Sequence, residues 1–324
     1  MRMLFTRPGL EQASSEAAAR HRARRYSEAG YGHLADLGCG IGGDLIALAA
    51  GREVLAVDRD PAHLRMAEYN AGVYDAAAGV RTAQADVRDV DLAGVDAVFT
   101  DPARRAPDGG GRRFRTGMSE PPLEWCFALA SRIPAVGIKA APGLATGAVP
   151  AGWETEFVAD GRDLKEAVLW SPALATAPAR ATILPEGHTL LREPGPEVPV
   201  AAPGAYLLDP NPAVTRAGLV EDLARRLGAW KIDSRIAFLS APADLRTPFA
   251  RTLRVVESAP WNEKDFARRL RARGIGAADL RRRGLAGDVD QIHRRLKLAG
   301  PNRATVVLTR VNDQPWGLIC TEPD

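Results

Sequence analysis

Asp36-Leu37-Gly38-Cys39-Gly40-Ile41-Gly42-Gly43 is the stretch of this chain that decides the fold. It joins a short apolar segment, His33–Leu37, to a helical one, Asp44–Ala50. A glycine-rich turn between a strand and a helix lets the backbone approach a ligand, and the helix presents free N–H groups to it. Counted from Gly38, the glycines also satisfy the G-x-G-x-x-G pattern of dinucleotide sites. On its own, the turn therefore indicates a nucleotide-like ligand without choosing its class.

Outward from this turn, short apolar segments alternate with helical ones. Such alternation indicates a parallel α/β sheet of the Rossmann-like kind. The expected strands are His33–Leu37, Glu53–Val57, Val80–Ala85, Val95–Thr100, Ala135–Ile138, Glu154–Val158 and Glu166–Trp170, and the expected helices are Asp44–Ala50, Pro61–Val73 and Leu123–Arg132.

Acidic residues stand at the ends of the first four expected strands. Asp36, before the glycine turn, can attract a cationic ligand but would repel a pyrophosphate. Asp58 can accept hydrogen bonds from ribose hydroxyls, a feature that NAD enzymes share. Asp86 can accept the amino group of an adenine, and Asp101-Pro102 ends the fourth strand. Each acid alone could be an ordinary strand-end cap, but their joint placement makes that interpretation improbable.

This order of acids resembles the class I S-adenosylmethionine (SAM) dependent methyltransferases. Gly38–Asp44, Val57–Pro61 and Asn70–Tyr74 further resemble the trimethylguanosine-synthase type of RNA guanine N2-methyltransferase, over roughly residues 33–105. Members of that family end the fourth strand with Asp-Pro-Pro-Trp, whose aromatic ring stacks on the target base. This chain has Ala103 and Arg104 at the last two positions, so it departs from that motif and lacks its aromatic ring.

The whole chain resembles bacterial methyltransferases with a C-terminal THUMP-like domain. The motifs that carry this likeness are Asp101–Arg105, Asp209–Ala213 with Arg216-Ala217-Gly218, and Arg294–Leu298. True THUMP domains bind RNA, so the resemblance implies an RNA partner by analogy.

The resemblance also implies a set of site residues. SAM is the implied cofactor, and a nitrogen of an RNA base, exocyclic or in the ring, is the implied methyl acceptor. The side chain of Asp101 and the carbonyl of Pro102 could accept hydrogen bonds from such an amine, which makes them the catalytic candidates. The cofactor-binding candidates are Asp36, Gly38, Cys39, Gly40, Gly42, Asp44, Asp58, Arg59, Asp86 and Val87, and the substrate-binding candidates are Arg104, Arg105 and Lys139.

Several alternatives stay open. Lys139 could equally be a surface lysine, and the basic loop 107–115 either clamps phosphates or is a solvated insertion. Transfer to carbon 5 of a pyrimidine would need a cysteine nucleophile, and none of Cys39, Cys126 and Cys320 is suitably placed. The other functions consistent with the chain are methylation of a small molecule or protein, and SAM or RNA binding without catalysis.

Composition sets broad limits on the chain. It has 324 residues, a formal net charge of +3 and a pI near 8.9, with only five lysines. An arginine-rich and alanine-rich composition is typical of GC-rich genomes, so arginine content alone is weak evidence for nucleic-acid binding. Three scattered cysteines argue against a disulfide framework and against a zinc site. We see no apolar run that could form a signal peptide or span a membrane, and expect a cytoplasmic protein without a metal.

Three regions are expected. Residues 1–30 form a helical segment whose arginines make either a solvated face or a phosphate contact, 31–175 form the methyltransferase domain, and 176–324 form an α+β, THUMP-like and ferredoxin-like region. Ser171–Arg180 and Glu193–Pro203 are expected linkers. Between residues 251 and 303 there are fourteen basic and six acidic residues, which favours RNA binding. The C-terminal elements expected are helices Val214–Leu227, Glu263–Arg273 and Val289–Leu298, and strands Arg251–Glu257 and Ala304–Val311.

Overall fold

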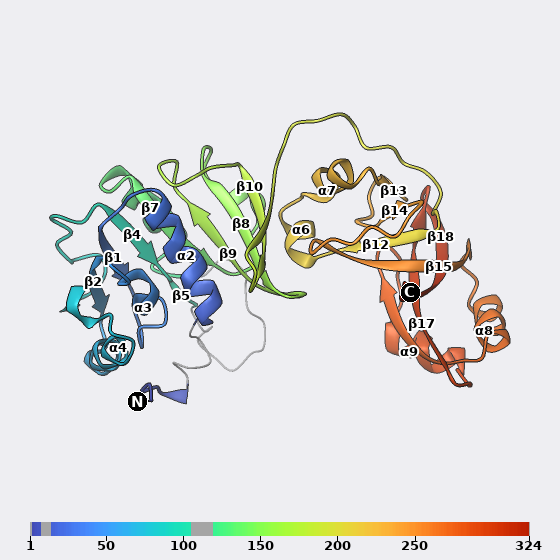
Figure 1. The fold of residues 1–324 in the computed structure, drawn as a ribbon, viewed down its shortest axis with the longest axis horizontal. Helices are drawn as coiled ribbons and strands as arrows, with labels where there is room; N and C mark the ends of the chain where they lie inside the picture. Colours follow the sequence, from blue (N-terminus) through green and yellow to red (C-terminus); the bar gives the residue numbers. More distant parts are fainter. Residues whose placement is uncertain (1, 8–13, 105–118, 324) are drawn as a thin grey trace. The chain divides into compact units, whose positions relative to one another are not determined.

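The computed structural model describes residues 2–7, 14–104 and 119–323 (Figure 1). Its contacts divide the chain into two compact units, Met1–Thr189 and Leu190–Asp324. The sequence placed this boundary between residues 175 and 176. The contacts place it later because two further strands, β10 (Ala179–Leu184) and β11 (His188–Leu191), extend the first sheet.

A nine-stranded sheet forms the centre of the first unit, in the order β11-β10-β8-β9-β7-β4-β1-β2-β3. The parallel α/β sheet expected from the sequence is confirmed, and within it β9 runs antiparallel to its two neighbours, β7 and β8. The remaining bounds are β1 His33–Leu37, β2 Glu53–Asp58, β3 Val80–Gln84, β4 Ala97–Thr100, β7 Ala135–Ala140, β8 Glu154–Asp160 and β9 Asp163–Trp170. The strands β1, β4 and β7 are neighbours and parallel, so their carboxyl ends meet at one edge.

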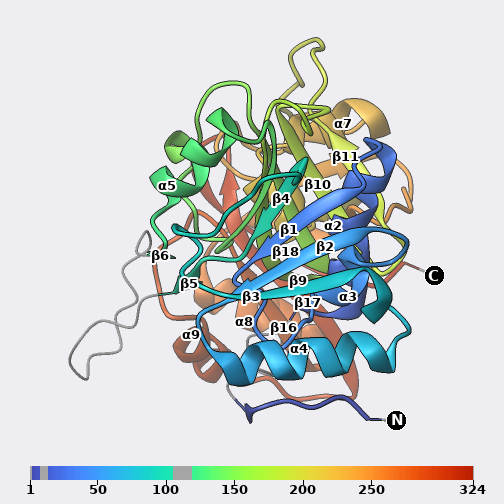
Figure 2. The same cartoon turned by 90° about the vertical axis from the view of Figure 1, so that its left-hand side faces the viewer.

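Helices cover both faces of this sheet (Figure 2). The helices α2 (Glu16–Glu28), α3 (Leu45–Leu48) and α4 (Pro61–Val73) contribute to one buried cluster, and α5 (Leu123–Ala128) contributes to another. The start of α4 follows from local chemistry, since the side chain of Asp60 accepts the N–H of Ala62 and a proline occupies the first turn. A two-stranded sheet, β5 (Ala103–Arg104) with β6 (Ser119–Glu120), follows β4.

Of the four arginines of α2, Arg20 and Arg24 are exposed, while the other two do not belong to the solvated or phosphate-binding face that the sequence suggested. Arg22 and Arg25 are buried. Both oxygens of Glu154 accept hydrogen bonds of 2.9 Å from Arg25, whose guanidinium also stacks over Trp170 at 4.9 Å. A run of arginines looks solvated in sequence, but acids on β8 and β9 provide the partners that burial of a charge requires.

Glu156 on β8 shows how strongly these acids are held. It is fully buried and contacts His21 at 2.7 Å, the indole N–H of Trp170 at 2.8 Å, and the hydroxyl of Thr182. Burial alone would raise the pKa of Glu156, but His21 and Arg25 outweigh it and hold that pKa well below its usual range. The charged form of Glu156 therefore stabilises the contact between α2 and the sheet.

The second unit has a seven-stranded sheet in the order β13-β14-β12-β15-β18-β17-β16, antiparallel except for β16 beside β17. Its α8 and α9 pack in a cluster with β17 and β18, and this confirms a mixed α+β region.

The helix expected at Val214–Leu227 is instead two helices, α6 and α7, separated at Gly218, whose φ is 70°. The bounds are β12 Tyr206–Pro210, α6 Pro212–Arg216, α7 Val220–Leu227, β13 Trp230–Lys231, β14 Leu239–Ala241, β15 Ala250–Pro260, α8 Glu263–Ala272, β16 Ile275–Arg282, α9 Val289–Leu296, β17 Asn302–Val311 and β18 Gln314–Thr321.

We expect Glu156→Gln to lower the free energy of unfolding at pH 7 by about 3 kcal/mol, because it breaks a buried ion pair. The pKa of Glu156 is lower in the folded protein, so its contribution is present above the unfolded value and is lost as pH falls through the folded one. Urea unfolding at about pH 7, 5 and 3.5 should show the difference from wild type narrowing below about pH 4.5. Glu186→Gln, in an exposed turn, is the matched control. A loss no larger than that of the control would contradict the ion-pair account.

Gly137→Ala tests the packing of α2 against β7. A Cβ at residue 137 would lie 2.6 Å from a ring carbon of Trp170 and would also clash with the hydroxyl of Tyr26. We expect this substitution to lower the free energy of unfolding by about 1–3 kcal/mol, measured by urea titration. Gly72→Ala, on α4 with no heavy atom within 4 Å of the added Cβ, should be neutral or stabilising by up to about 1 kcal/mol. Equal effects of the two changes would show that Gly137 is not tightly packed.

Candidate active site

The glycine turn after β1 is held in one conformation by backbone contacts. The N–H groups of Gly38 and Cys39 both donate to the carbonyl of Val57, at 2.9 and 3.0 Å. Gly38 and Gly42 both have a φ of 88°, which favours glycine, and a Cβ on Gly42 would lie 3.0 Å from the Cα of Ala67 on α4. The turn is therefore pressed against α4 where a side chain would not fit.

Asp58 at the end of β2 is joined to the glycine turn. Its Oδ2 accepts the N–H of Gly40 at 2.9 Å, and its Oδ1 accepts the N–H of Asp60 at 2.9 Å. Arg59 follows directly, and its carbonyl accepts a hydrogen bond from Gln84 at 3.5 Å. Asp58 thus holds the glycine turn in place through its hydrogen bond with Gly40.

The turn after β3 contains Asp86 and Val87. Asp86 accepts the N–H of Arg88 at 3.0 Å, and a guanidinium nitrogen of Arg88 lies 3.5 Å from its other oxygen. Arg88 also pairs with Glu120 on β6. The sequence reasoning missed Arg88, although a basic residue two positions after a strand-end acid could have indicated a local partner.

Asp36 is the most unusual group of the site. It is 1% exposed, and its Oδ2 has no hydrogen-bond partner within the parts of the chain that the structure describes. Burial raises the pKa of Asp36 well above its usual range, and the neighbouring carboxylates of Asp44 and Asp101 raise it further. A buried carboxyl oxygen without a partner is costly, so this position fits a ligand that supplies a hydrogen-bond donor or a positive charge.

A chain of polar contacts runs along the carboxyl edge of the sheet. The Nζ of Lys139, on β7, lies 2.6 Å from Oδ2 of Asp101 and 3.3 Å from the hydroxyl of Ser14. The Ser14 hydroxyl donates to Asp44 at 2.7 Å, and Asp44 accepts from Nε of Arg22 at 2.9 Å. Lys139, proposed from the sequence as a substrate contact, is therefore paired with the candidate catalytic acid.

Arg22 continues this chain to Glu166 on β9. Sequence reasoning missed Ser14, Arg22 and Glu166 as members of the site. An available signal was the acidic pattern of β8 and β9, because acids inside largely apolar strands need buried basic partners.

The other candidates are spread around this edge. Pro102 and Cys39 are buried, and Arg104 belongs to β5. Arg105 and the loop 107–115 lie outside the described residues.

Burial raises the pKa of the Cys126 and Cys320 thiols to about 12, whereas a nucleophilic cysteine needs a lowered pKa to form a thiolate.

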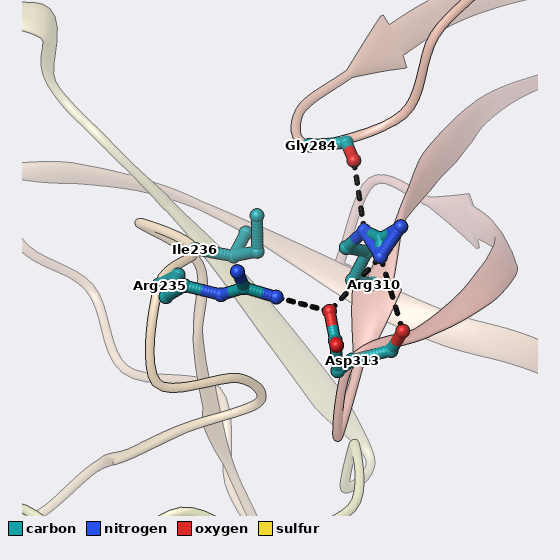
Figure 3. A pocket seen from close by; sticks show the side chains of 5 residues that line it. All are labelled: Arg235, Ile236, Gly284, Arg310 and Asp313. Atoms are coloured by element: carbon teal, nitrogen blue, oxygen red, sulfur yellow. Dashed lines mark hydrogen bonds and ion pairs between the residues drawn. The ribbon is translucent and has the colours of Figure 1, made fainter.

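A polar cavity of about 510 Å³ lies in the second unit (Figure 3). Its lining includes Arg235 and Arg310, which both bond to the carboxylate of Asp313 at the turn between β17 and β18. The buried Asp233 accepts the backbone N–H groups of Arg235 and Asp313, at 2.9 and 2.7 Å. Both arginines of the lining are thus paired with Asp313, which offsets part of their positive charge.

No helix among residues 2–7, 14–104 and 119–323 is long and apolar enough to cross a membrane. The same ranges contain no cluster of three or more His, Cys, Asp or Glu side chains arranged to hold a metal ion.

Comparisons with known proteins agree with the geometry of both units. Residues 32–116 match the family described as RNA cap guanine-N2 methyltransferase, and residues 250–322 match the family described as THUMP domain-like. A protein from Porphyromonas gingivalis W83, described as a methyltransferase, has a crystal structure that aligns with a TM-score of 0.78 and 21% identity. That alignment covers 98% of this chain and 83% of that one, and it shows a shared fold.

Two relatives from Mycobacterium tuberculosis, strains CDC 1551 and H37Rv, are named S-adenosylmethionine-dependent methyltransferases. Each is 36% identical to this chain over 325 residues, which covers 95% of this chain and 85% of the relative. Identity at this level over nearly the whole length confirms the family expected from the strand-end acids. The chain belongs to the family of S-adenosylmethionine-dependent methyltransferases, and its second unit carries a THUMP-like domain.

Proposed function

We propose that this methyltransferase transfers the methyl group of SAM to a nitrogen of an RNA base. The observation that carries the cofactor site is the buried, unpartnered carboxyl of Asp36 beside the glycine turn. Among the described groups whose charges act most strongly on Asp36, Asp44, Asp101 and Asp58 are acidic and Arg22 is basic. A site with this excess favours a cationic ligand such as SAM.

The residues of the strand ends fit the parts of SAM. SAM supplies an activated methyl group on a sulfonium. Asp36 and the glycine turn would bind the amino-acid end of the cofactor, with the backbone at Gly38, Gly40 and Gly42 allowing close approach. Asp58 would accept the ribose hydroxyls, and the Asp86-Val87 turn would hold the adenine.

The acceptor side is built from Asp101 and Pro102. One oxygen of Asp101 is bonded to Lys139, which leaves the other oxygen and the carbonyl of Pro102 to accept hydrogen bonds from an amine. Methylation makes that amine cationic until it loses a proton, so a neighbouring carboxylate stabilises the product as it forms. Most of the rate enhancement then comes from holding acceptor and methyl group in line.

The assignment to RNA is supported by the two family matches, one to RNA guanine-N2 methyltransferases and one to THUMP-like domains. The excess of arginines supports it less than the sequence suggested, because many are paired. Arg251 bonds to Glu322, Arg269 to Glu257, and Arg295 to Glu263. Surface pairs of this kind reduce the positive charge available to phosphates.

Asp36→Asn tests the cofactor site. We expect it to weaken SAM binding at least tenfold, about 1.4 kcal/mol, since the amide lacks the negative charge. A cationic ligand favours ionised Asp36, whose pKa burial raises, so wild-type affinity should increase as the pH rises toward that raised pKa, and binding should release a proton. Calorimetry in buffers of different ionisation enthalpy measures both effects. Asp91→Asn, an exposed loop acid, is the control. Wild-type affinity and proton release in Asp36→Asn would contradict this role of Asp36.

Transfer of labelled methyl groups to RNA tests the acceptor. Total RNA from cells that lack the protein should gain label in N-methylated nucleosides, resolved by mass spectrometry after digestion. Asp101→Ala should lower the rate roughly 100-fold or more, because the amine then lacks its acceptor group. Its SAM affinity should remain within a few-fold of wild type. Label that appears only in protein or in small solutes would overturn the RNA assignment and favour the alternative substrates.

A further inference from the structure

Lys139 lies between the candidate catalytic acid, Asp101, and the hydroxyl of Ser14. Its Nζ lies 2.6 Å from Oδ2 of Asp101, and its side chain is only 16% exposed. The hydroxyl of Ser14 lies 3.3 Å from the same Nζ and donates to Asp44 at 2.7 Å. Asp44 in turn directly follows the glycine turn. The ammonium is thus fixed by contacts from the N-terminal segment as well as from β4.

The neighbouring strands keep this arrangement in place. In the sheet β7 lies between β4 and β9, and residues 139 and 140 on β7 pair with residues 168 and 167 on β9. Glu166 therefore lies on β9 close to Lys139, where its charge attracts the ammonium. Arg22 bonds both Glu166 and Asp44, so this series of polar contacts ends at a buried side chain of α2.

We propose that Lys139 is a positioning residue, which fixes the charge and orientation of the Asp101 carboxylate so that its second oxygen faces the acceptor amine. This inference rests on the proposed function for the identity of the acceptor. Lys139 then acts on the reaction through Asp101 and does not itself contact the substrate.

The charges that face Asp101 come from several elements. Burial raises the pKa of Asp101, and Lys139 opposes this more strongly than any other neighbour. Asp44 raises that pKa and Arg22 lowers it, while Asp101 and Asp36 repel each other. Glu166 acts through its attraction for Lys139. Without Lys139, burial and Asp44 would raise the pKa of Asp101, and Arg22 would be the strongest described group that opposes them.

Lys139→Met should therefore raise the pKa of Asp101 and move its protonation toward neutral pH. A protonated Asp101 cannot accept the proton of the amine, so we expect kcat at pH 7 to fall roughly 10- to 100-fold and to recover partly as pH rises. KM for SAM should change by less than about threefold, because the cofactor groups are untouched. Lys139→Arg keeps a positive charge and should restore much of the rate. The fall of kcat at low pH should then occur near the same pH as in wild type.

Two measurements keep this inference separate from the proposed function. The first is the pH profile of methyl transfer from SAM to total RNA for wild type, Lys139→Met, Lys139→Arg and the control Lys165→Met. Lys165 is a matched control because it is an exposed lysine of β9 that likewise pairs with an acid, Asp163. The second is a carboxyl ¹³C NMR titration of Asp101 in the full chain, assigned with Asp101→Asn, which needs no RNA.

A raised pKa of Asp101 in Lys139→Met, together with a displaced acid limb and rescue by arginine, would support the inference. An unchanged titration of Asp101 in a folded Lys139→Met protein would overturn it, whatever the activity. A rate loss that is equal at every pH would also overturn it. Failure of the wild-type protein to methylate RNA would remove the proposed function, while the titration would still decide whether Lys139 controls Asp101.

Discussion

The buried contact between Arg22 and the carboxylates of Asp44 and Glu166 is the constraint on which the first unit depends. A guanidinium without exposure to solvent must be matched by acids that are well oriented, or burial would be strongly unfavourable. The match is possible only when α2 lies against the sheet with β9 and the glycine turn in their observed places. One ion-pair network therefore fixes the helix, the strand and the turn together.

The same network explains how the candidate active site is assembled. In a parallel sheet, the carboxyl ends of neighbouring strands meet at one edge, which brings Asp36, Asp101 and Lys139 together from β1, β4 and β7. Strand order alone would place the carboxylates of Asp36 and Asp101 near each other, where they repel. Arg22, supplied from α2, offsets part of that repulsion, and it does so from a residue more than a hundred positions away from Lys139.

Local patterns predicted the features that have local causes. The strand His33–Leu37 and the helix Pro61–Val73 were confirmed with their bounds, because alternation, a capping aspartate and a proline in the first turn are visible in sequence. Burial of Arg22 could not be predicted in this way, since Glu166 is 144 positions distant. The break at Gly218 was missed because the amphipathic pattern continues through it.

Stability and binding make opposite demands on Asp36. With its Oδ2 unpartnered, it is the kind of group that weakens a folded protein by about 1–3 kcal/mol. Replacement by an apolar residue would relieve that cost. The neighbouring basic groups do not match Asp36, since Arg22 bonds to Asp44 and Lys139 to Asp101. The protein thus keeps its basic groups occupied and leaves one carboxyl unmatched. A cation that binds there would regain the cost, and the sulfonium or ammonium group of SAM would supply such a charge under the proposed function.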